Sequence, residues 1–243
     1  MFKKWNEKIE KRINYYTKPT SVAGLLANWS YNSINKFNKR EPGGWLLDIG
    51  CGDGSQVQKL KDRSKYIGID RNLERLEILK LKDRSKYIGI DRNLERLEIL
   101  KSNYPEVTAI YADVCSLPFK SNSIKYVFSS NTFEHIWYLK DAVIELYRCC
   151  TSDAEINIVI PTEGGLWNVG RNLLSKPHFT KMYPDIDFEF ISHVEHCNQA
   201  KQVIRSLEMF FDCKIKGIPL YFPSIYLNGL LEISCKRRKN ISI

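Results

Sequence analysis

The sequence has no long apolar run. Its apolar stretches, such as 217–223 and 227–233, are short, whereas a helix that spans a membrane needs about 20 apolar residues. Residues 1–12 carry charges on both sides of Trp5 and have no apolar core, so they are not expected to be a signal peptide. These absences argue against a membrane-spanning or secreted protein and predict a cytoplasmic one.

Cysteine motifs are missing as well. The seven cysteines include no CxxC pair and show no metal-ligand spacing, so the sequence predicts no metal site. An odd number of cysteines without a secretion signal is typical of reduced cytosolic thiols.

Positive charge is in excess. The net charge of +9 comes from 37 basic and 28 acidic residues and suits an anionic partner, either nucleic acid, a lipid head group or a phosphorylated sugar. The basic residues are spread along the chain, which favours a solvated basic surface.

The length of 243 residues predicts one domain, with two small domains as the alternative. We place this domain at 43–243, after an N-terminal helical segment at 1–42.

One segment occurs twice. Residues 60–80 read LKDRSKYIGIDRNLERLEILK, and residues 81–101 repeat this 21-residue segment letter for letter. Solenoid repeats diverge and occur in series. Two identical copies are instead typical of one recent tandem duplication, or of an engineered or assembled sequence. Both copies have the same local propensities and compete for one structural role.

Strand and helix patterns alternate along the chain. Short apolar runs typical of buried strands lie at 45–49, 65–70, 86–91, 107–111, 126–129 and 156–160. Helical patterns lie at 56–61, 72–80, 93–101 and 141–150. The alternation predicts an α/β fold with a doubly wound, mostly parallel sheet. Apolar runs at 209–219 and 226–235 predict an antiparallel C-terminal edge.

A glycine-rich turn follows the first expected strand. It reads DIGCGDG over 48–54, and its glycines permit a tight turn and close approach of a ligand to the backbone. Ser55 stands where the third glycine of a GxGxxG dinucleotide fingerprint would follow, and no GK[ST] of a P-loop is present.

From about Gly44 to Pro161 the chain resembles the class I S-adenosylmethionine-dependent methyltransferases, specifically the small-molecule group related to the ubiquinone-biosynthesis enzymes. The motifs that carry the resemblance are LLDIGCGDGS (46–55), YIGID (66–70 and 87–91), YADVCSLPF (111–119) and VFSSNTFEHI (127–136). The resemblance implies a Rossmann-like methyltransferase fold with S-adenosylmethionine as cofactor.

The resemblance also implies cofactor contacts. Gly50 and Gly52 would face the methionine part, and Asp48 would support its ammonium. The acid after the second strand would bind both ribose hydroxyls. Read singly, such acids could instead be helix caps or turn residues. The expected set, with Asp113 and Val114 beside adenine, is Asp48, Gly50, Cys51, Gly52, Asp70, Arg71, Asp91, Asp113, Val114, Ser129 and Asn131.

The duplication leaves three placements open. The surplus residues lie in the connection before the second strand, in the connection after the second helix, or in an additional βα unit. That unit would displace Asp113 by about 4.8 Å, one strand spacing, and harm adenine binding. We predict that the first copy forms the strand beside the first one. The second copy is then expected on the distal face or at an edge.

Two histidines are candidate catalytic residues. His135 follows the fourth expected strand, and His196 lies in ISHVEHCN (191–198) after the fifth. An imidazole could deprotonate an attacking hydroxyl. Each histidine could instead cap or pack, and positioning alone can suffice for so good an electrophile. Residues 162–200 are expected to be an acceptor-side insertion, with an aromatic-rich lid over 165–190.

The leading function is methyl transfer from S-adenosylmethionine to a hydroxyl or carboxyl of a small molecule, glycan or lipid-linked intermediate. An RNA methyltransferase is the alternative suggested by the basic charge, although the fourth strand ends in SSNTF rather than NPPY. A third reading is a catalytically inactive cofactor-binding or interaction domain.

Overall fold

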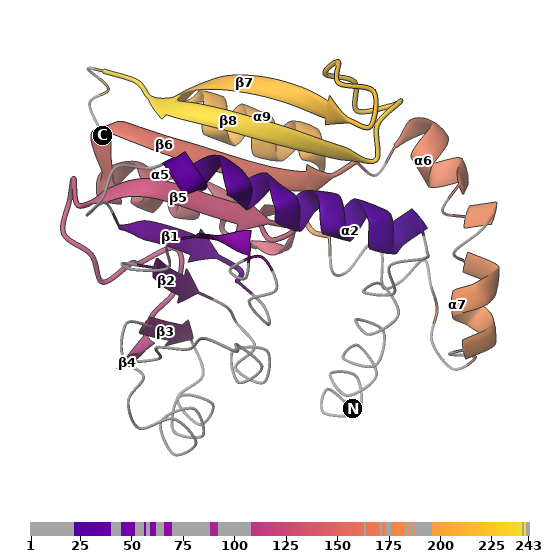
Figure 1. Ribbon diagram of the computed structural model, residues 1–243, viewed down its shortest axis with the longest axis horizontal. Coiled ribbons are helices and arrows are strands. Elements are labelled where there is room, and N and C mark those ends of the chain that lie inside the picture. The colour runs from indigo at the N-terminus through magenta and orange to yellow at the C-terminus, as the bar shows by residue number, and fades with distance from the viewer. Residues whose placement is uncertain are drawn as a thin grey trace.

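The protein was analysed as a computed structural model. It describes residues 22–39, 45–51, 56, 59–61, 66–69, 88–91, 108–162, 164–170, 172–173, 176–182, 184, 187, 196–239 and 241. These residues form an eight-stranded sheet with the order β4-β3-β2-β1-β5-β6-β8-β7 (Figure 1). None of the helices in these ranges is long and apolar enough to cross a membrane.

The strands lie close to the positions expected from the sequence. They are β1 (Leu46–Ile49), β2 (Tyr66–Ile69), β3 (Ile88–Asp91), β4 (Thr108–Tyr111), β5 (Ile124–Ser130), β6 (Cys150–Pro161), β7 (Phe211–Ile218) and β8 (Leu230–Arg237). The first six strands are parallel to one another, whereas β8 is antiparallel to both β6 and β7. The α/β fold and its antiparallel C-terminal edge are therefore confirmed.

Helices cover both faces of the sheet (Figure 1). They are α2 (Val22–Asn32), the 3-10 helices η1 (Ser33–Lys39) and η4 (Phe133–His135), α5 (Leu139–Cys149), α6 (Gly165–Gly170), α7 (Lys176–Met182) and α9 (Ala200–Glu208). Figure 1 shows α2 across one face and α5 with α9 on the other. The expected helix at 72–80 and its copy at 93–101 lie outside the described residues.

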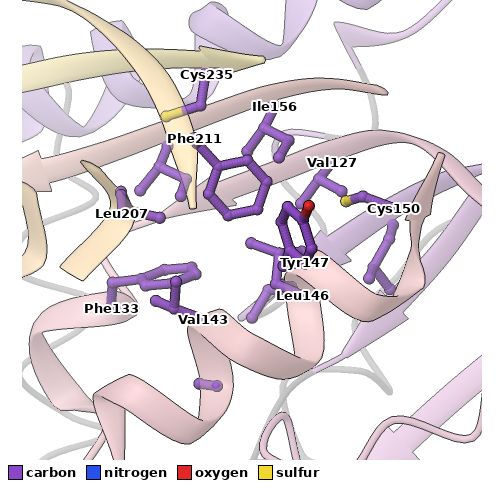
Figure 2. Packing of buried hydrophobic residues seen from close by; sticks show 14 of the residues in the cluster. Val127, Phe133, Val143, Leu146, Tyr147, Cys150, Ile156, Leu207, Phe211 and Cys235 are labelled. Carbon is purple, nitrogen blue, oxygen red and sulfur yellow. The ribbon is translucent and has the colours of Figure 1, made fainter. Parts of the chain in front are cut away.

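The larger core lies between the sheet and the α5–α9 pair. Leu146 and Tyr147 of α5 and Leu207 of α9 are buried against Val127 and Phe211 of the sheet (Figure 2). The apolar residues of α5 recur at helical spacing, so one stripe of the helix is buried while the opposite side faces water. On the other face, Leu26 and Trp29 of α2 pack against Val159, Ile218 and Leu230.

The second copy of the repeat forms an internal strand. The first copy supplies β2 beside β1, as predicted. The second copy was predicted on the distal face or at an edge, and this prediction is wrong, because its strand β3 lies between β2 and β4. Ile67, Gly68 and Ile69 pair with their own duplicates, Ile88, Gly89 and Ile90.

Backbone hydrogen bonding gives the physical reason. A strand outside the sheet has unpaired N–H and C=O groups along its edges. Insertion between two parallel neighbours pairs both edges of β3. The third placement considered for the surplus residues, an additional strand wound into the sheet, is therefore the one adopted.

Candidate functional site

The strand order reverses between β1 and β5. From β1 the chain proceeds through β2, β3 and β4 on one side of the sheet and then continues with β5 on the other side. Ligands of open α/β sheets bind at the carboxyl ends of the strands, at such a reversal point. The candidate site therefore lies where β1 ends at Ile49 and β5 ends at Ser130.

Gly50 forms the turn directly after β1. Its φ is +76°, a left-handed conformation that favours glycine. A Cβ at this position would come within 1.8 Å of Thr132 Oγ1, so the space beside it is filled by the residues after β5. The backbone N–H groups of Gly50 and Cys51 both donate to the carbonyl of Ile69 at the end of β2. The Ile69 carbonyl at the end of β2 thus fixes the backbone of the turn.

Asp48 lies in β1, two residues before Gly50, and is fully buried. Its Oδ2 accepts a hydrogen bond of 3.0 Å from Gln56 Nε2, and the same amide group donates to the carbonyl of Cys51 at 2.7 Å. Gln56 therefore ties the aspartate to the backbone of the turn. Gln56 was not among the expected site residues, although it lies just after the glycine motif in the sequence.

The end of β5 is tied to its surroundings by hydroxyl groups. Ser129 Oγ donates to the carbonyl of Ile49 at 2.8 Å and so joins β5 to β1. The hydroxyls of Ser130 and of Ser30 in α2 are hydrogen-bonded, and Asn131 Nδ2 donates to Ser30 Oγ at 3.4 Å. Asn131 also has a positive φ of 52°. No pattern in the sequence pointed to Ser30.

Asp113 forms a turn after β4. Its Oδ1 accepts the backbone N–H of Cys115 at 3.0 Å, and its carbonyl accepts that of Ser116 at 2.9 Å. Val114 packs against the main core. The structure thus shows the turn role that was the alternative for Asp113. Because β3 intervenes, β4 lies three strand spacings from β1 instead of two, an increase of about 4.8 Å.

An ion pair on α5 anchors the loop after this turn. Arg148 donates to Glu145 and to the carbonyls of Leu117 and Phe119, while Glu145 accepts the N–H of Leu117 at 2.6 Å. The hydrogen bond from Arg148 is the largest of the effects that lower the pKa of the Glu145 carboxyl, and burial opposes it.

This anchor predicts a pH-dependent stability. A lowered folded-state pKa stabilises the fold above the ordinary carboxyl pKa, and this stabilisation is lost as the pH falls through the lowered value. Arg148→Met should therefore lower the free energy of unfolding more at about pH 7 than at about pH 3. Urea denaturation at both pH values measures the difference. An equal loss at the two pH values would contradict the role of the pair.

The two candidate histidines come together. The ring centroids of His135 and His196 are 4.7 Å apart, and the planes meet at 83°. The Glu134 carboxylate, 2% exposed, has its Oε1 3.9 Å from His135 Nε2. Glu134 was not among the expected site residues, although it directly precedes His135. The structure thus joins the end of β5 to the segment before α9.

Several expected site residues cannot be placed in this way. Gly52, Asp70 and Arg71 lie outside the described residues. For Asp91 only the backbone is described, and it ends β3 opposite Tyr111 of β4. Of the expected lid, α6 and α7 are described, and they extend from the end of the sheet where β6 finishes (Figure 1).

Comparison with known proteins bears on this arrangement. Residues 47–157 match the family described as "Methyltransferase domain". This span begins in β1 and ends in β6, so it includes the reversal point. No curated protein matches the chain.

Solved structures share the fold at low sequence identity. The possible histamine N-methyltransferase of Thermotoga maritima has a TM-score of 0.55 at 15% identity, over 94% of this chain and 97% of that one. Phosphoethanolamine N-methyltransferase 2 of Haemonchus contortus has a TM-score of 0.54 at 14% identity, over 91% of this chain and 58% of its own. Geranyl diphosphate C-methyltransferase of Streptomyces coelicolor has a TM-score of 0.56 at 11% identity, over 92% and 82%.

Residues 47–157 thus match a methyltransferase domain, and the sheet shares its fold with solved structures of methyltransferases. The Haemonchus contortus enzyme is in complex with S-adenosyl-L-methionine. Glycine at position 50 permits the sharp turn at the strand end, and its missing side chain makes room for Thr132. The buried carboxylate of Asp48, two residues before Gly50, is a hydrogen-bond acceptor suited to an ammonium.

Proposed function

We propose that the protein transfers the methyl group of S-adenosylmethionine to a hydroxyl or carboxyl oxygen of a small molecule, a glycan or a lipid-linked intermediate. The observation that carries this proposal is the grouping of His135, His196 and Glu134 beside the carboxyl end of β5. Imidazole groups at this place can hold an acceptor oxygen and receive its proton. The ubiquinone-biosynthesis-like group is the subgroup we propose on the resemblance of its motifs.

The cofactor is proposed to bind across the ends of β1, β2 and β4. Gly50, Cys51 and Gly52 would contact the methionine part, and Asp48 would bind its ammonium. Ser129 and Asn131 would contact the cofactor from the β5 side.

Asp70 with Arg71 would bind the ribose, since the first copy lies beside β1. Asp113 and Val114 would reach adenine only across the extra strand. Asp91, at the end of that strand, is the alternative ribose ligand.

When bound, the cofactor supplies an electrophilic methyl group on a sulfonium, and the sulfur keeps the electron pair of the broken C–S bond. The protein's own residues handle the acceptor. One imidazole of the pair accepts the hydroxyl proton as the new C–O bond forms, and Glu134 next to His135 stabilises the resulting positive charge. A carboxylate acceptor has no proton to lose and needs only to be positioned.

Two further segments flank the proposed cofactor site in the sequence. Residues 162–200, with α6 and α7, would form the acceptor side, and residues 1–42 a helical segment ahead of the methyltransferase domain at 43–243. We also propose a cytoplasmic location, because an odd number of cysteines, seven, is typical of reduced cytosolic thiols. Neither nucleic acid binding nor a membrane span is part of the proposal, although contact with a lipid head group is compatible with the basic charge.

Methyl-labelled S-adenosylmethionine tests the reaction class. We expect label in the lipid, glycan or small-molecule fraction of a cell extract, in a product with a methyl ether or methyl ester. Label in RNA would favour the RNA methyltransferase reading. Absence of transfer together with binding of S-adenosylhomocysteine by calorimetry would favour an inactive binding domain.

Loss of the imidazole pair should slow turnover. His196→Gln and His135→Gln keep a polar side chain but remove a proton acceptor, so kcat should fall about 100-fold for a hydroxyl acceptor. Affinity for S-adenosylhomocysteine should stay within about twofold, because the imidazoles act on the acceptor. Glu155→Gln, an exposed position on β6, is the matched control. Unchanged kcat in both histidine variants would rule out their role.

A further inference from the structure

Three possible metal ligands converge at the end of β5. Glu134 and His135 lie in η4, and His196 lies in the segment before α9. One ligand atom from each residue lies within 4.8 Å of those of the other two. The spacing of the cysteines predicted no metal site. These three ligands give no such motif, because two of them are neighbours in the sequence and the third is far downstream.

Hydrogen bonds from Asn198 join the two segments that carry these ligands. Asn198 Nδ2 donates to the carbonyls of Phe133 at 3.1 Å and Ile136 at 2.6 Å. The backbone N–H of Asn198 donates to the carbonyl of Glu134 at 3.0 Å. Asn198 is buried, as are Phe133 and Ile136. The ligand-bearing backbone is therefore held in place on both sides of the cluster, which is the preorganisation that a metal site requires.

The donor chemistry is that of a divalent transition metal. Two imidazole nitrogens and one carboxylate oxygen suit zinc, cobalt, iron or manganese better than magnesium or calcium, which prefer oxygen ligands. Burial of a carboxylate is costly, and a neighbouring cation offsets this cost. Donor atoms around a tetrahedral ion with bonds of about 2.1 Å are roughly 3.4 Å apart. Rotation of the two partly exposed imidazoles can bring the atoms to this separation.

We propose that Glu134, His135 and His196 form a binding site for one divalent transition-metal ion. Three protein ligands leave a coordination position open, as in catalytic sites. If the proposed methyl transfer to oxygen is correct, this position takes the acceptor oxygen. In that case both imidazoles would serve as ligands, and neither would accept the proton. The ion would instead favour loss of the hydroxyl proton to water as the methyl group moves from sulfur to oxygen.

Titration of the purified, metal-free full chain with cobalt(II) tests the site. We expect one ion per chain and the visible absorption of cobalt with nitrogen and oxygen ligands, displaced by zinc. Glu134→Gln and His196→Gln should each weaken cobalt binding roughly 100-fold or more. Glu155→Gln and Cys197→Ser are the controls and should bind cobalt as the parent does. The cysteine control also shows that thiols are not the ligands.

Binding of S-adenosylhomocysteine, measured by calorimetry on every variant, verifies that each one is folded. Equal cobalt affinity in the parent and the two ligand variants, or no cobalt binding by the parent, would overturn the metal site. The metal site and the reaction are separable. Methylation of oxygen that survives without cobalt binding removes only the metal site. Cobalt binding without any oxygen-methylated product removes only the proposed function.

Discussion

Removal of residues 81–101 is expected to tighten the binding of S-adenosylhomocysteine by about 10- to 100-fold, equivalent to roughly 1–3 kcal/mol. The physical reason is the position of β4. In the full chain β3 separates β4 from β2, so the residues after β4 lie one strand spacing too far from β1. Without the second copy β4 pairs with β2, and Asp113 moves about 4.8 Å toward the turn at Gly50. Calorimetry on both chains measures the change.

The identity of the two copies makes this experiment unambiguous. Deletion of 60–80 and deletion of 81–101 produce the same amino-acid sequence, so the result does not depend on which copy is removed. Asp113→Asn, made in both chains, is the matched control. It should weaken binding in the shortened chain and have little effect in the full chain. Equal affinities of the two unmutated chains would show that the residues after β4 do not contact the ligand.

Replacement of Gly50 by alanine is expected to abolish the binding of S-adenosylhomocysteine and to lower the free energy of unfolding by about 2–4 kcal/mol. Two effects add. A non-glycine residue at a positive φ costs about 1–2 kcal/mol. The new Cβ would also lie 1.8 Å from Thr132 Oγ1 and 2.7 Å from Thr132 Cβ, so the segment after β5 must move.

A double-mutant cycle separates these effects. Thr132→Gly removes the three atoms nearest to the new Cβ, so Gly50→Ala should cost less in this background, leaving mainly the backbone strain. Thr132→Gly alone accounts for the lost hydrogen bond to the carbonyl of Ser130. Urea denaturation of the four proteins gives the free energies. An alanine variant as stable as the parent would contradict the close approach of the two segments.

The strands were predictable because their signals are local. A short apolar run before glycines identified β1, and the same kind of pattern located β5 and β6. The alternation with helical stripes then predicted a parallel sheet. The turn at Gly50 was equally visible, since few other residues adopt a positive φ at a strand end. Gln56 and Ser30 were missed because amide and hydroxyl groups carry no periodic pattern.

The sequence by itself determined the strands, their order along the chain and the glycine turn at the end of β1, where the candidate site lies. Only the tertiary structure decided the position of the second copy. Identical segments have identical local propensities, so the choice depended on the hydrogen bonds that β2 and β4 offer to both edges of β3. Only the tertiary structure also joined Glu134 and His135 to His196. Segments so far apart in the sequence meet through packing and the buried bonds of Asn198, which no local pattern encodes.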